Sequence, residues 1–285
     1  MTMRMDDRRC FFARCLMAAL LLGPASGAHA AREMLEFEIE GQTRRVLMFV
    51  PDTRSTEPRT LMVVFHGRGD DDTAFANAVQ LHRDWPEAII AYPRGELREA
   101  STMRGWQYRP GDQGDRDLAL VDRLLEETAR RHGTRPENTH AAGFSNGGHF
   151  VLLLLAERPE AFATFTVIGS VHPGFESDAP PKPVMYLFGR GEGREFKDDW
   201  AKTVEALTRH NRTQGPLVKF MTCCNLQSPG PGGAPFVFGL YNAGHIWPSD
   251  GNQWLMEFSQ HGWQPAGNKQ PGTRAEGEPI PLIQP

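Results

Sequence analysis

A serine between two glycines gives the first sign of chemistry in this 285-residue sequence. Ser145 lies at the centre of Gly-Phe-Ser-Asn-Gly at 143–147, a Gly-x-Ser-x-Gly pattern. The sequence predicts a short strand just before it, at 139–142, and a helix just after it, at 149–157. In that context the pattern is typical of a nucleophile elbow, a turn so tight that its neighbours must be small. The alternative is a serine that caps an ordinary helix. We take Ser145 as the candidate nucleophile.

A serine hydroxyl is a weak nucleophile at neutral pH and needs a base beside it. In folds with such an elbow the base comes late in the chain, after the last strands. His245 occupies that place, directly after Gly244 and shortly after a strand predicted at 236–241. Of the ten histidines, those that also lie near a strand end or the elbow are His66, His149 and His172. We interpret His66 as structural, and His149 lies on the elbow helix, so His245 is the candidate base.

The third member of such a triad is a carboxylate that holds the imidazole in one tautomer. It is expected in the loop after the strand predicted at 184–188, between the nucleophile and the base in sequence. Glu192 is the first acidic residue there and is our first candidate. Its rivals are Glu195, Asp198 and Asp199. The last two also suit the first turn of a helix predicted at 198–210.

Acyl transfer also needs preorganised N–H donors for the negatively charged oxygen of the intermediate. The backbone N–H of Asn146, the residue after the serine, is predicted to supply one of them. The second is expected from the loop His-Gly-Arg-Gly at 66–69, through the backbone N–H of Arg68. The alternative for this loop is a plain glycine turn. This chemistry requires no metal and no organic cofactor.

The elements that would position these residues alternate along the chain. Two strands at 35–40 and 44–50 flank a turn at Gly41-Gln42 and suggest an antiparallel start. The other predicted elements are strands at 60–65, 88–92, 139–142, 165–168, 184–188 and 236–241 and helices at 117–131, 149–157, 198–210 and 252–261. Fully apolar strands imply a sheet covered on both faces. We therefore expect an α/β-hydrolase fold, with a doubly wound, mostly parallel sheet and helices on both faces.

The N-terminal region 1–30 has the pattern of a cleaved export signal. Arginines precede an apolar run at 16–22, and Ala-His-Ala at 28–30 supplies small residues for cleavage. The run is too short to span a bilayer, which needs about 20 residues. The Arg8-Arg9 pair also resembles a twin-arginine signal. We expect a periplasmic or secreted protein with one catalytic domain at 31–264 and a flexible Pro- and Gly-rich tail at 265–285.

Charge and cysteine content limit the partners and the kind of scaffold. The formal net charge of -4 argues against nucleic acid or an anionic membrane as the main partner. Signal cleavage would remove Cys10 and Cys15 and leave only the adjacent pair Cys223 and Cys224. This pair is expected as two thiols or as a strained local ring, without a catalytic role.

Several segments together resemble a known group, the secreted polyhydroxybutyrate depolymerase-like and feruloyl or acetylxylan esterase-like α/β-hydrolases. The resemblance extends over 44–258 and rests on the segments at 63–67, 91–95, 143–148 and 244–248 and on the Trp106 loop that leads to Asp117-Leu118. It implies that Ser145 is the nucleophile, His245 the base, and Arg68 and Asn146 the oxyanion donors, with Asp117 as a structural acid. The group usually has a Gly-x-x-Asp acid, where this sequence has Gly-Arg-Gly-Glu at 189–192.

The resulting hypothesis is an exported serine carboxylic-ester hydrolase that works through an acyl-serine intermediate on a small-molecule or oligomeric ester. The alternatives are an inactive α/β-hydrolase fold that serves as a binding protein, and a serine peptidase or acyltransferase with the same triad. Aromatic residues that could line an aryl or sugar-ester pocket, or simply fix loops, are Trp85, Trp106, Tyr108 and Trp247. The sequence indicates no particular oligomeric state.

Overall fold

The structure is a computed structural model that describes residues 30–52, 55–97, 101–193 and 196–260. The expected export signal and the expected tail therefore lie outside the described residues, apart from Ala30 at the end of the signal. Within these ranges no helix combines the length and the apolar character needed to cross a membrane.

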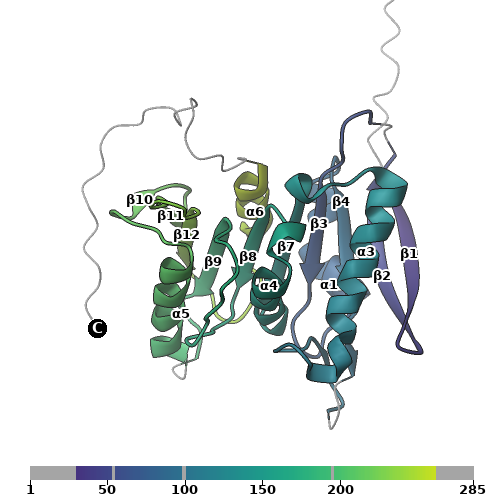
Figure 1. Ribbon diagram of the computed structural model, residues 1–285, viewed down its shortest axis with the longest axis horizontal. Helices are drawn as coiled ribbons and strands as arrows, with labels where there is room; N and C mark the ends of the chain where they lie inside the picture. Colours follow the sequence, from purple (N-terminus) through teal and green to yellow (C-terminus); the bar gives the residue numbers. More distant parts are fainter. Residues whose placement is uncertain (1–29, 53–54, 98–100, 194–195, 261–285) are drawn as a thin grey trace, which may run out of the picture.

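One large sheet organises the molecule (Figure 1). In spatial order its strands are β1 (Ala30–Ile39), β2 (Gln42–Pro51), β4 (Ile89–Pro93), β3 (Leu61–Phe65), β7 (Thr139–Phe144), β8 (Thr164–Ile168), β9 (Val184–Gly189), β12 (Phe236–Tyr241), β11 (Cys224–Gln227) and β10 (Val218–Lys219). Within the run from β4 to β12 in this order, each strand is parallel to the next. Antiparallel pairing occurs only toward the two edges of this sheet, at β1-β2-β4 and at β12-β11-β10.

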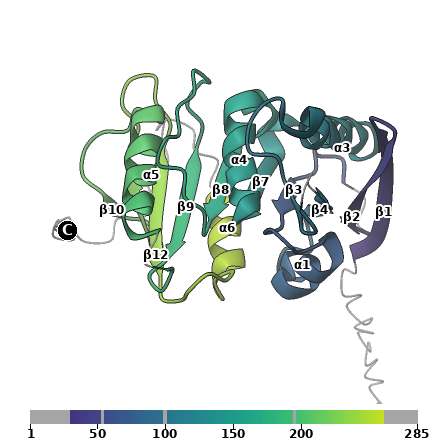
Figure 2. The same cartoon turned by 90° about the horizontal axis from the view of Figure 1, so that it is seen from below.

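Helices cover both faces of this sheet. They are α1 (Asp72–Val79), α2 (Leu81–Asp84), α3 (Arg116–His132), α4 (Asn146–Glu157), α5 (Lys197–His210) and α6 (Gly251–Gln260). Seen from below, α3, α4 and α5 lie on one side of the strands, and α1 and α6 lie on the other (Figure 2). The expected doubly wound, mostly parallel α/β sheet is thereby confirmed.

The central strands contribute side chains alternately to two core layers, as the period of two in a strand requires. In β3, Val63 and Phe65 belong to the layer that contains Phe150 of α4. Met62 and Val64 of the same strand belong to the layer under α1 and α6. Because both faces are buried, every residue of β3 can be apolar, which explains the continuous apolar runs in the sequence.

The first hairpin turn differs by one residue from the sequence-based expectation. β1 and β2 are joined by Glu40 and Gly41, and Ile39 pairs directly with Gln42. The predicted turn at Gly41-Gln42 is therefore wrong. Both turn residues have positive φ, 51° at Glu40 and 75° at Gly41, as a two-residue turn of the primed type requires. Glutamate is an unusual residue for that conformation, so the sequence did not point to it.

The sequence pattern does not single out α1, α2, β10, β11 or the small two-stranded sheet of β5 (Glu96–Leu97) and β6 (Arg104–Gly105). For α1 a local signal exists. The Asp71 side chain accepts hydrogen bonds from the backbone N–H groups of Thr73 and Ala74 and so caps the helix. An aspartate cap is difficult to recognise inside the run of aspartates at 70–72.

Cys223 and Cys224 form a disulfide in the structure, with their Cα atoms 3.7 Å apart. Of the two expected states, the local ring is the one observed. Cys224 is buried at the start of β11, and a Cβ at Gly239 of the neighbouring strand would lie 2.6 Å from its Sγ. The glycine in β12 therefore makes room for the ring.

Candidate active site

The turn between β7 and α4 holds Ser145 in a conformation that few non-glycine residues adopt, with φ 55° and ψ -119°. The Ser145 N–H donates to the Ile168 carbonyl, 2.9 Å away, which ties the turn to β8. A Cβ at Gly143 would collide with the backbone of Gly147, and one at Gly147 would collide with the Phe65 carbonyl. The close approach of these backbones accounts for both glycines of the Gly-x-Ser-x-Gly pattern.

His245 lies beside this serine. Its Nε2 is 2.9 Å from Ser145 Oγ, and its Nδ1 is 2.7 Å from Glu192 Oε2. Since a carboxylate can only accept, Nδ1 carries the proton and donates to Glu192, which leaves Nε2 to accept from the serine hydroxyl. The ring also contacts Phe144, with centroids 4.8 Å apart. The structure thus brings three sequence-predicted residues into one hydrogen-bonded line.

Two glycines bring the acid and the base within reach of each other. The Gly191 N–H donates to the Ala243 carbonyl at 2.9 Å. A Cβ at Gly189 would lie 2.6 Å from the Ala243 oxygen and 2.7 Å from the Gly244 oxygen. The loop after β9 and the loop after β12 therefore pack backbone against backbone, and only glycine fits between them. This contact places Glu192 beneath the imidazole, where its side chain is 2 % exposed.

The rival acids are not in this position. Asp198 and Asp199 lie in the first turn of α5, as their helix-start interpretation predicts. The Asp199 carbonyl accepts from Thr203, and its carboxylate is 3.6 Å from Lys202 Nζ. Glu195 lies outside the described residues.

The Glu192 hydrogen bond raises the pKa of His245 above its ordinary value of 6.5, and the negative charge of Glu192 adds to this effect. Partial burial of the ring opposes the shift, because desolvation disfavours the imidazolium. A base with a raised pKa takes a proton from the serine more readily, which suits the role predicted for His245.

The two predicted oxyanion donors come from neighbouring elements. Asn146 is the first residue of α4, where a backbone N–H has no partner within the helix. Arg68 follows β3, and both residues line the same cavity as Ser145 and His245. Gly67 lets the loop lie against the elbow, since a Cβ there would be 3.2 Å from the Phe144 ring. Positive charge from the helix N-terminus adds to the field at this point.

The cavity above the serine has a volume of about 450 Å³. Besides the predicted site residues it is lined by Tyr108, His149, Gly169, Ser170, Val171, Phe188, Gly193 and Phe196. Of the four aromatic candidates, Tyr108 alone is among its lining residues. Trp85 and Trp106 are buried, and Trp247 packs edge-on against Phe75 with centroids 5.6 Å apart. Those three therefore correspond to the alternative interpretation, that of loop anchors.

Sequence reasoning missed a polar pair in the cavity wall. His149 Nδ1 is 2.8 Å from the Ser170 hydroxyl, and the His149 ring meets Tyr108 edge-on. Burial, with a smaller effect of His172, lowers the pKa of His149 to about 4, so the ring is neutral at pH 7. Its position one turn after the nucleophile was visible in the sequence, but Ser170 lies on another strand end. No local signal connects the two.

His66 has the structural role that its loop position suggests. Its Nδ1 is 2.7 Å from the Gly67 oxygen and its Nε2 accepts from the Gly95 N–H at 2.9 Å. This pattern defines a neutral ring with the proton on Nδ1. Burial accordingly lowers the pKa of His66.

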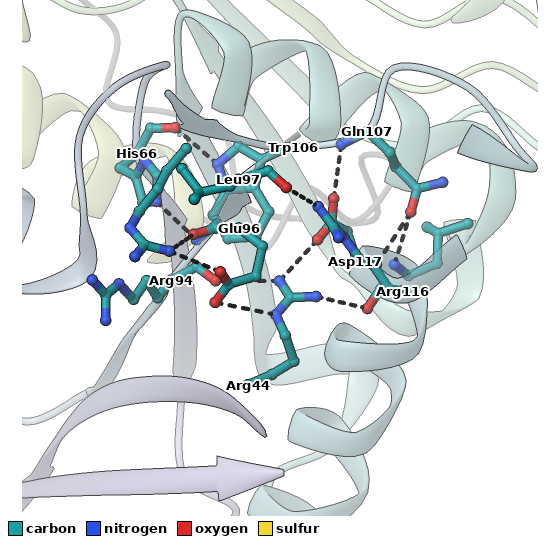
Figure 3. A network of polar contacts seen from close by, with 12 residues as sticks. Arg44, His66, Arg94, Glu96, Leu97, Trp106, Gln107, Arg116 and Asp117 are labelled. Carbon is teal, nitrogen blue, oxygen red and sulfur yellow. Dashed lines mark hydrogen bonds and ion pairs between the residues drawn. The ribbon is translucent and has the colours of Figure 1, made fainter. Parts of the chain in front are cut away.

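A buried ion pair joins Arg44 to Asp117 in a network that also includes His66 and Trp106 (Figure 3). Arg44 of β2 donates to Asp117 Oδ1 at 2.8 Å, and the two side chains are 0 % and 1 % exposed. The other oxygen of Asp117 accepts from the Gln107 N–H at 2.8 Å. Arg44 also donates to the carbonyls of Arg94 and Arg116. Asp117 therefore holds structure together rather than facing the cavity, as the family resemblance implies.

The fold and the elbow define a protein of the α/β-hydrolase class. Residues 38–227, more than half of the chain, match the model of the Esterase family, described as "Putative esterase". The chain belongs to this family. The expected α/β-hydrolase fold and membership of an esterase family are therefore confirmed.

One curated relative is the "Putative esterase NocK" of Nocardia uniformis subsp. tsuyamanensis, 25% identical over 179 residues. That match takes in 58% of this chain and 49% of the relative, so the chain spans about half of that protein's length.

Two solved structures have a similar fold. One is described as a ferulic acid esterase. It has a TM-score of 0.59 and 12% identity over 82% of this chain and 99% of that one. The other is an acetyl xylan esterase from Aspergillus awamori, with a TM-score of 0.61 and 14% identity over 79% of this chain and 98% of that one. At these identities the likeness concerns the fold.

Proposed function

We propose that this chain is an exported serine hydrolase that cleaves carboxylic esters through an acyl-Ser145 intermediate. The observation that carries the proposal is the continuous line of hydrogen bonds from Glu192 through His245 to Ser145. It ends at a cavity, in a chain of the esterase family. An inactive binding protein would have no need of a strained serine aligned with a base.

In the first half of the reaction, Ser145 Oγ attacks the ester carbonyl carbon while His245 Nε2 takes the hydroxyl proton. The carbonyl oxygen becomes negatively charged and accepts from the backbone N–H groups of Asn146 and Arg68. Collapse of the tetrahedral intermediate breaks the bond to the alcohol oxygen. The alcohol leaves with the proton returned by His245, and the acyl group stays on Ser145.

The second half repeats these steps with water. His245 takes a proton from a water molecule as it attacks the acyl carbon, and the same two N–H groups stabilise the new oxyanion. The acid departs and the proton returns to Ser145 Oγ. Glu192 remains ionised throughout and stabilises the imidazolium in both halves.

Esters with a compact acyl group, aryl or short aliphatic, are the proposed substrate class. A cavity of about 450 Å³ with Tyr108, Phe188 and Phe196 in its wall suits such a group. The solved structures described as ferulic acid and acetyl xylan esterases support this class by analogy. Turnover of methyl ferulate, acetylated xylan, short nitrophenyl esters and hydroxybutyrate oligomers would rank the candidates. Equal rates on all four would argue against selection by the cavity.

Labelling with a fluorophosphonate probe followed by peptide mapping tests the nucleophile directly. The expected result is one label, on the peptide that contains Ser145, and no label in Ser145→Ala. Ser170 is a second serine in the cavity wall and serves as an internal comparison. A label on Ser170, or no label on the wild-type protein, would contradict the proposal.

Export is the second part of the proposal, and its support is the pattern of residues 1–30. Cleavage after Ala30 would leave 31–39 of β1 available for pairing with β2. Expression of the full chain in a Gram-negative host should yield a periplasmic protein whose mass corresponds to a start at Ala31. Recovery of the uncleaved chain from the cytoplasm would contradict it.

A further inference from the structure

One short segment contacts both predicted oxyanion donors. We call residues 104–107 the bridging segment; it begins with β6 and ends at Gln107. On one side it bonds to the first residue of α4, and on the other to the 66–69 loop. These are the two elements that carry the N–H groups of Asn146 and Arg68.

The contact with α4 is made by the side chain of Asn146, not by its backbone. Its Oδ1 accepts from the Trp106 N–H at 2.7 Å, and its Nδ2 donates to the Trp106 carbonyl at 3.2 Å. One amide thus bonds both backbone groups of one residue. Asn146 is 4 % exposed, so these bonds are shielded from water.

The contact with the loop brackets Arg68. On one side of it the Trp106 indole N–H donates to the His66 carbonyl at 2.9 Å. On the other side the Gly69 N–H donates to the Arg104 carbonyl at 2.8 Å. The indole is fully buried and stacks on Phe150 of α4, with centroids 5.3 Å apart. Trp106 therefore contacts both elements at once.

The far end of the bridging segment is fixed as well. The Gln107 N–H donates to Asp117, whose other oxygen accepts from Arg44 (Figure 3). The Gln107 side chain in turn accepts from the backbone N–H groups at the start of α3. The segment is thus held between a buried ion pair and the two donor-bearing elements.

We propose that the Asn146 side chain and Trp106 are positioning residues that set the spacing of the two oxyanion donors. The inference rests on the function proposed above. Donors of this kind stabilise the transition state only when they lie about 2.7–3.1 Å from the oxyanion. A misplacement of about 1 Å can cost about 10²-fold in rate. Because both donors depend on one segment, a change in that segment displaces them together.

The test compares Asn146→Ala and the milder Trp106→Phe with the control Asn211→Ala. Asn211 is fully buried and its amide also bonds backbone, the Lys182 and Pro235 carbonyls at 2.8 and 3.1 Å. Asn211 directly follows α5, and the two carbonyls that it bonds lie just before the N-terminal ends of β9 and β12. Ser145, by contrast, follows the C-terminal end of β7. Asn146→Ala keeps the backbone N–H and removes only the bonds to Trp106.

The expected result is a fall in kcat of about 10- to 100-fold in Asn146→Ala and Trp106→Phe, with KM changed by less than about twofold. The pH–rate profile should keep its shape, since Glu192 and His245 are untouched. Asn211→Ala should lose stability but keep kcat. Wild-type kcat in both folded site variants, or a loss expressed mainly in KM, would overturn the proposal.

Hydrogen exchange gives a second readout that does not depend on turnover. Amides at 66–70 and 144–148 should exchange faster in Asn146→Ala and Trp106→Phe than in the wild type, and unchanged in Asn211→Ala. Unchanged exchange in both site variants would also overturn the proposal. If the wild type hydrolysed no ester, the proposed function would fail, whereas exchange would still test the coupling of the two donors.

Discussion

At the scale of single residues, the two oxygens of Glu192 have different surroundings. Oε2 bonds His245 Nδ1, whereas Oε1 is buried without a hydrogen-bond partner among the described residues. Burial of a carboxylate with a single hydrogen bond costs free energy, so its presence here calls for a functional reason. The purpose consistent with this geometry is stabilisation of the imidazolium that forms when His245 takes the serine proton.

Glu192→Gln should lower kcat/KM by about 10²- to 10⁴-fold at neutral pH. The amide keeps the shape of the side chain, but it has no charge to stabilise the imidazolium and it no longer fixes the tautomer of the neutral ring. Glu192→Asp should also have lower turnover, since the aspartate side chain is shorter by one methylene and its carboxylate lies farther from His245. Asp199→Asn is the matched control on α5 and should retain near-normal turnover. Ester turnover of the three variants measures this. Collapse in Asp199→Asn with normal activity in Glu192→Gln would move the acid to Asp199.

The pH profile follows from the same pair. Only neutral His245 can accept the serine proton, so kcat/KM should rise with pH through a pKa above the ordinary 6.5. Loss of the Glu192 charge removes the cause of the shift, and the rising limb in Glu192→Gln should move to lower pH. Because the contact with Glu192 raises the pKa of His245 in the folded state, it stabilises the fold at pH values below the unfolded-state pKa. This contribution is lost as the pH rises through the folded-state pKa of His245. A limb that stays in place or moves upward would contradict this account.

The position of Glu192 could be predicted only in part from the sequence. Its place directly after a strand favoured it, and the structure puts it beneath His245. The physical reason is distant in sequence, because Gly189 and Gly191 pack against the 243–244 backbone. No local pattern reveals that contact. Ser145 and His245 were easier, since tight turn chemistry and order along the chain mark both.

At the scale of elements, the elbow depends on how closely β7, α4 and β3 approach. Gly147 lies against the Phe65 carbonyl with no room for a methyl group. The same contact brings the start of α4 beside the loop after β3, and so places Asn146 near Arg68. Backbone packing at one glycine therefore determines the relative position of two parts of the site.

Gly147→Ala should destabilise the fold by about 1–3 kcal/mol or more, because the new Cβ must push strand backbone aside. Ester turnover should fall further than stability alone explains, since the elbow is displaced. Gly174→Ala is the control, as a Cβ there would have no atom within 4 Å and the residue has no positive φ. Denaturant unfolding and turnover of both variants provide the measurement. Equal stability of the two would contradict the packing argument.

The helices and strands that could be predicted from the sequence are those whose burial leaves a clear pattern of apolar residues. The central strands and the helices from α3 to α6 were visible as apolar runs or helical periods, and all are present. Helix α1 has few turns and its cap lies within an acidic run, so its signal was weak. The edge strands β10 and β11 are short and partly exposed, which removes the apolar pattern that marks a strand.

At the scale of the whole molecule, the Arg44–Asp117 pair joins β2 near one edge of the sheet to α3 and to the bridging segment. Hydrogen bonds from Arg44 to two backbone carbonyls satisfy much of the guanidinium. Arg44 Nε also lies 3.9 Å from Glu96 Oε1, but removal of Asp117 would take away the nearer carboxylate of this buried guanidinium. The core and the site therefore share a structural support.

Asp117→Asn should lower the free energy of unfolding by about 3–5 kcal/mol. The control is Asp122→Asn, at a residue of the same helix that forms a salt bridge with Arg158. The Asp122 side chain is 45% exposed. That control should cost less than about 1 kcal/mol. Urea unfolding of the two variants measures the difference. Similar losses of unfolding free energy would contradict a larger contribution from the buried pair.

Turnover of a short nitrophenyl ester by Ser145→Ala shows whether Ser145 is the nucleophile of an ester hydrolase. We expect kcat to fall by about four to six orders of magnitude with the melting temperature preserved, because the attacking oxygen is gone. The double variant with His245→Ala should lose little more, since nucleophile and base act as one unit. A folded Ser145→Ala protein with wild-type turnover would contradict the account.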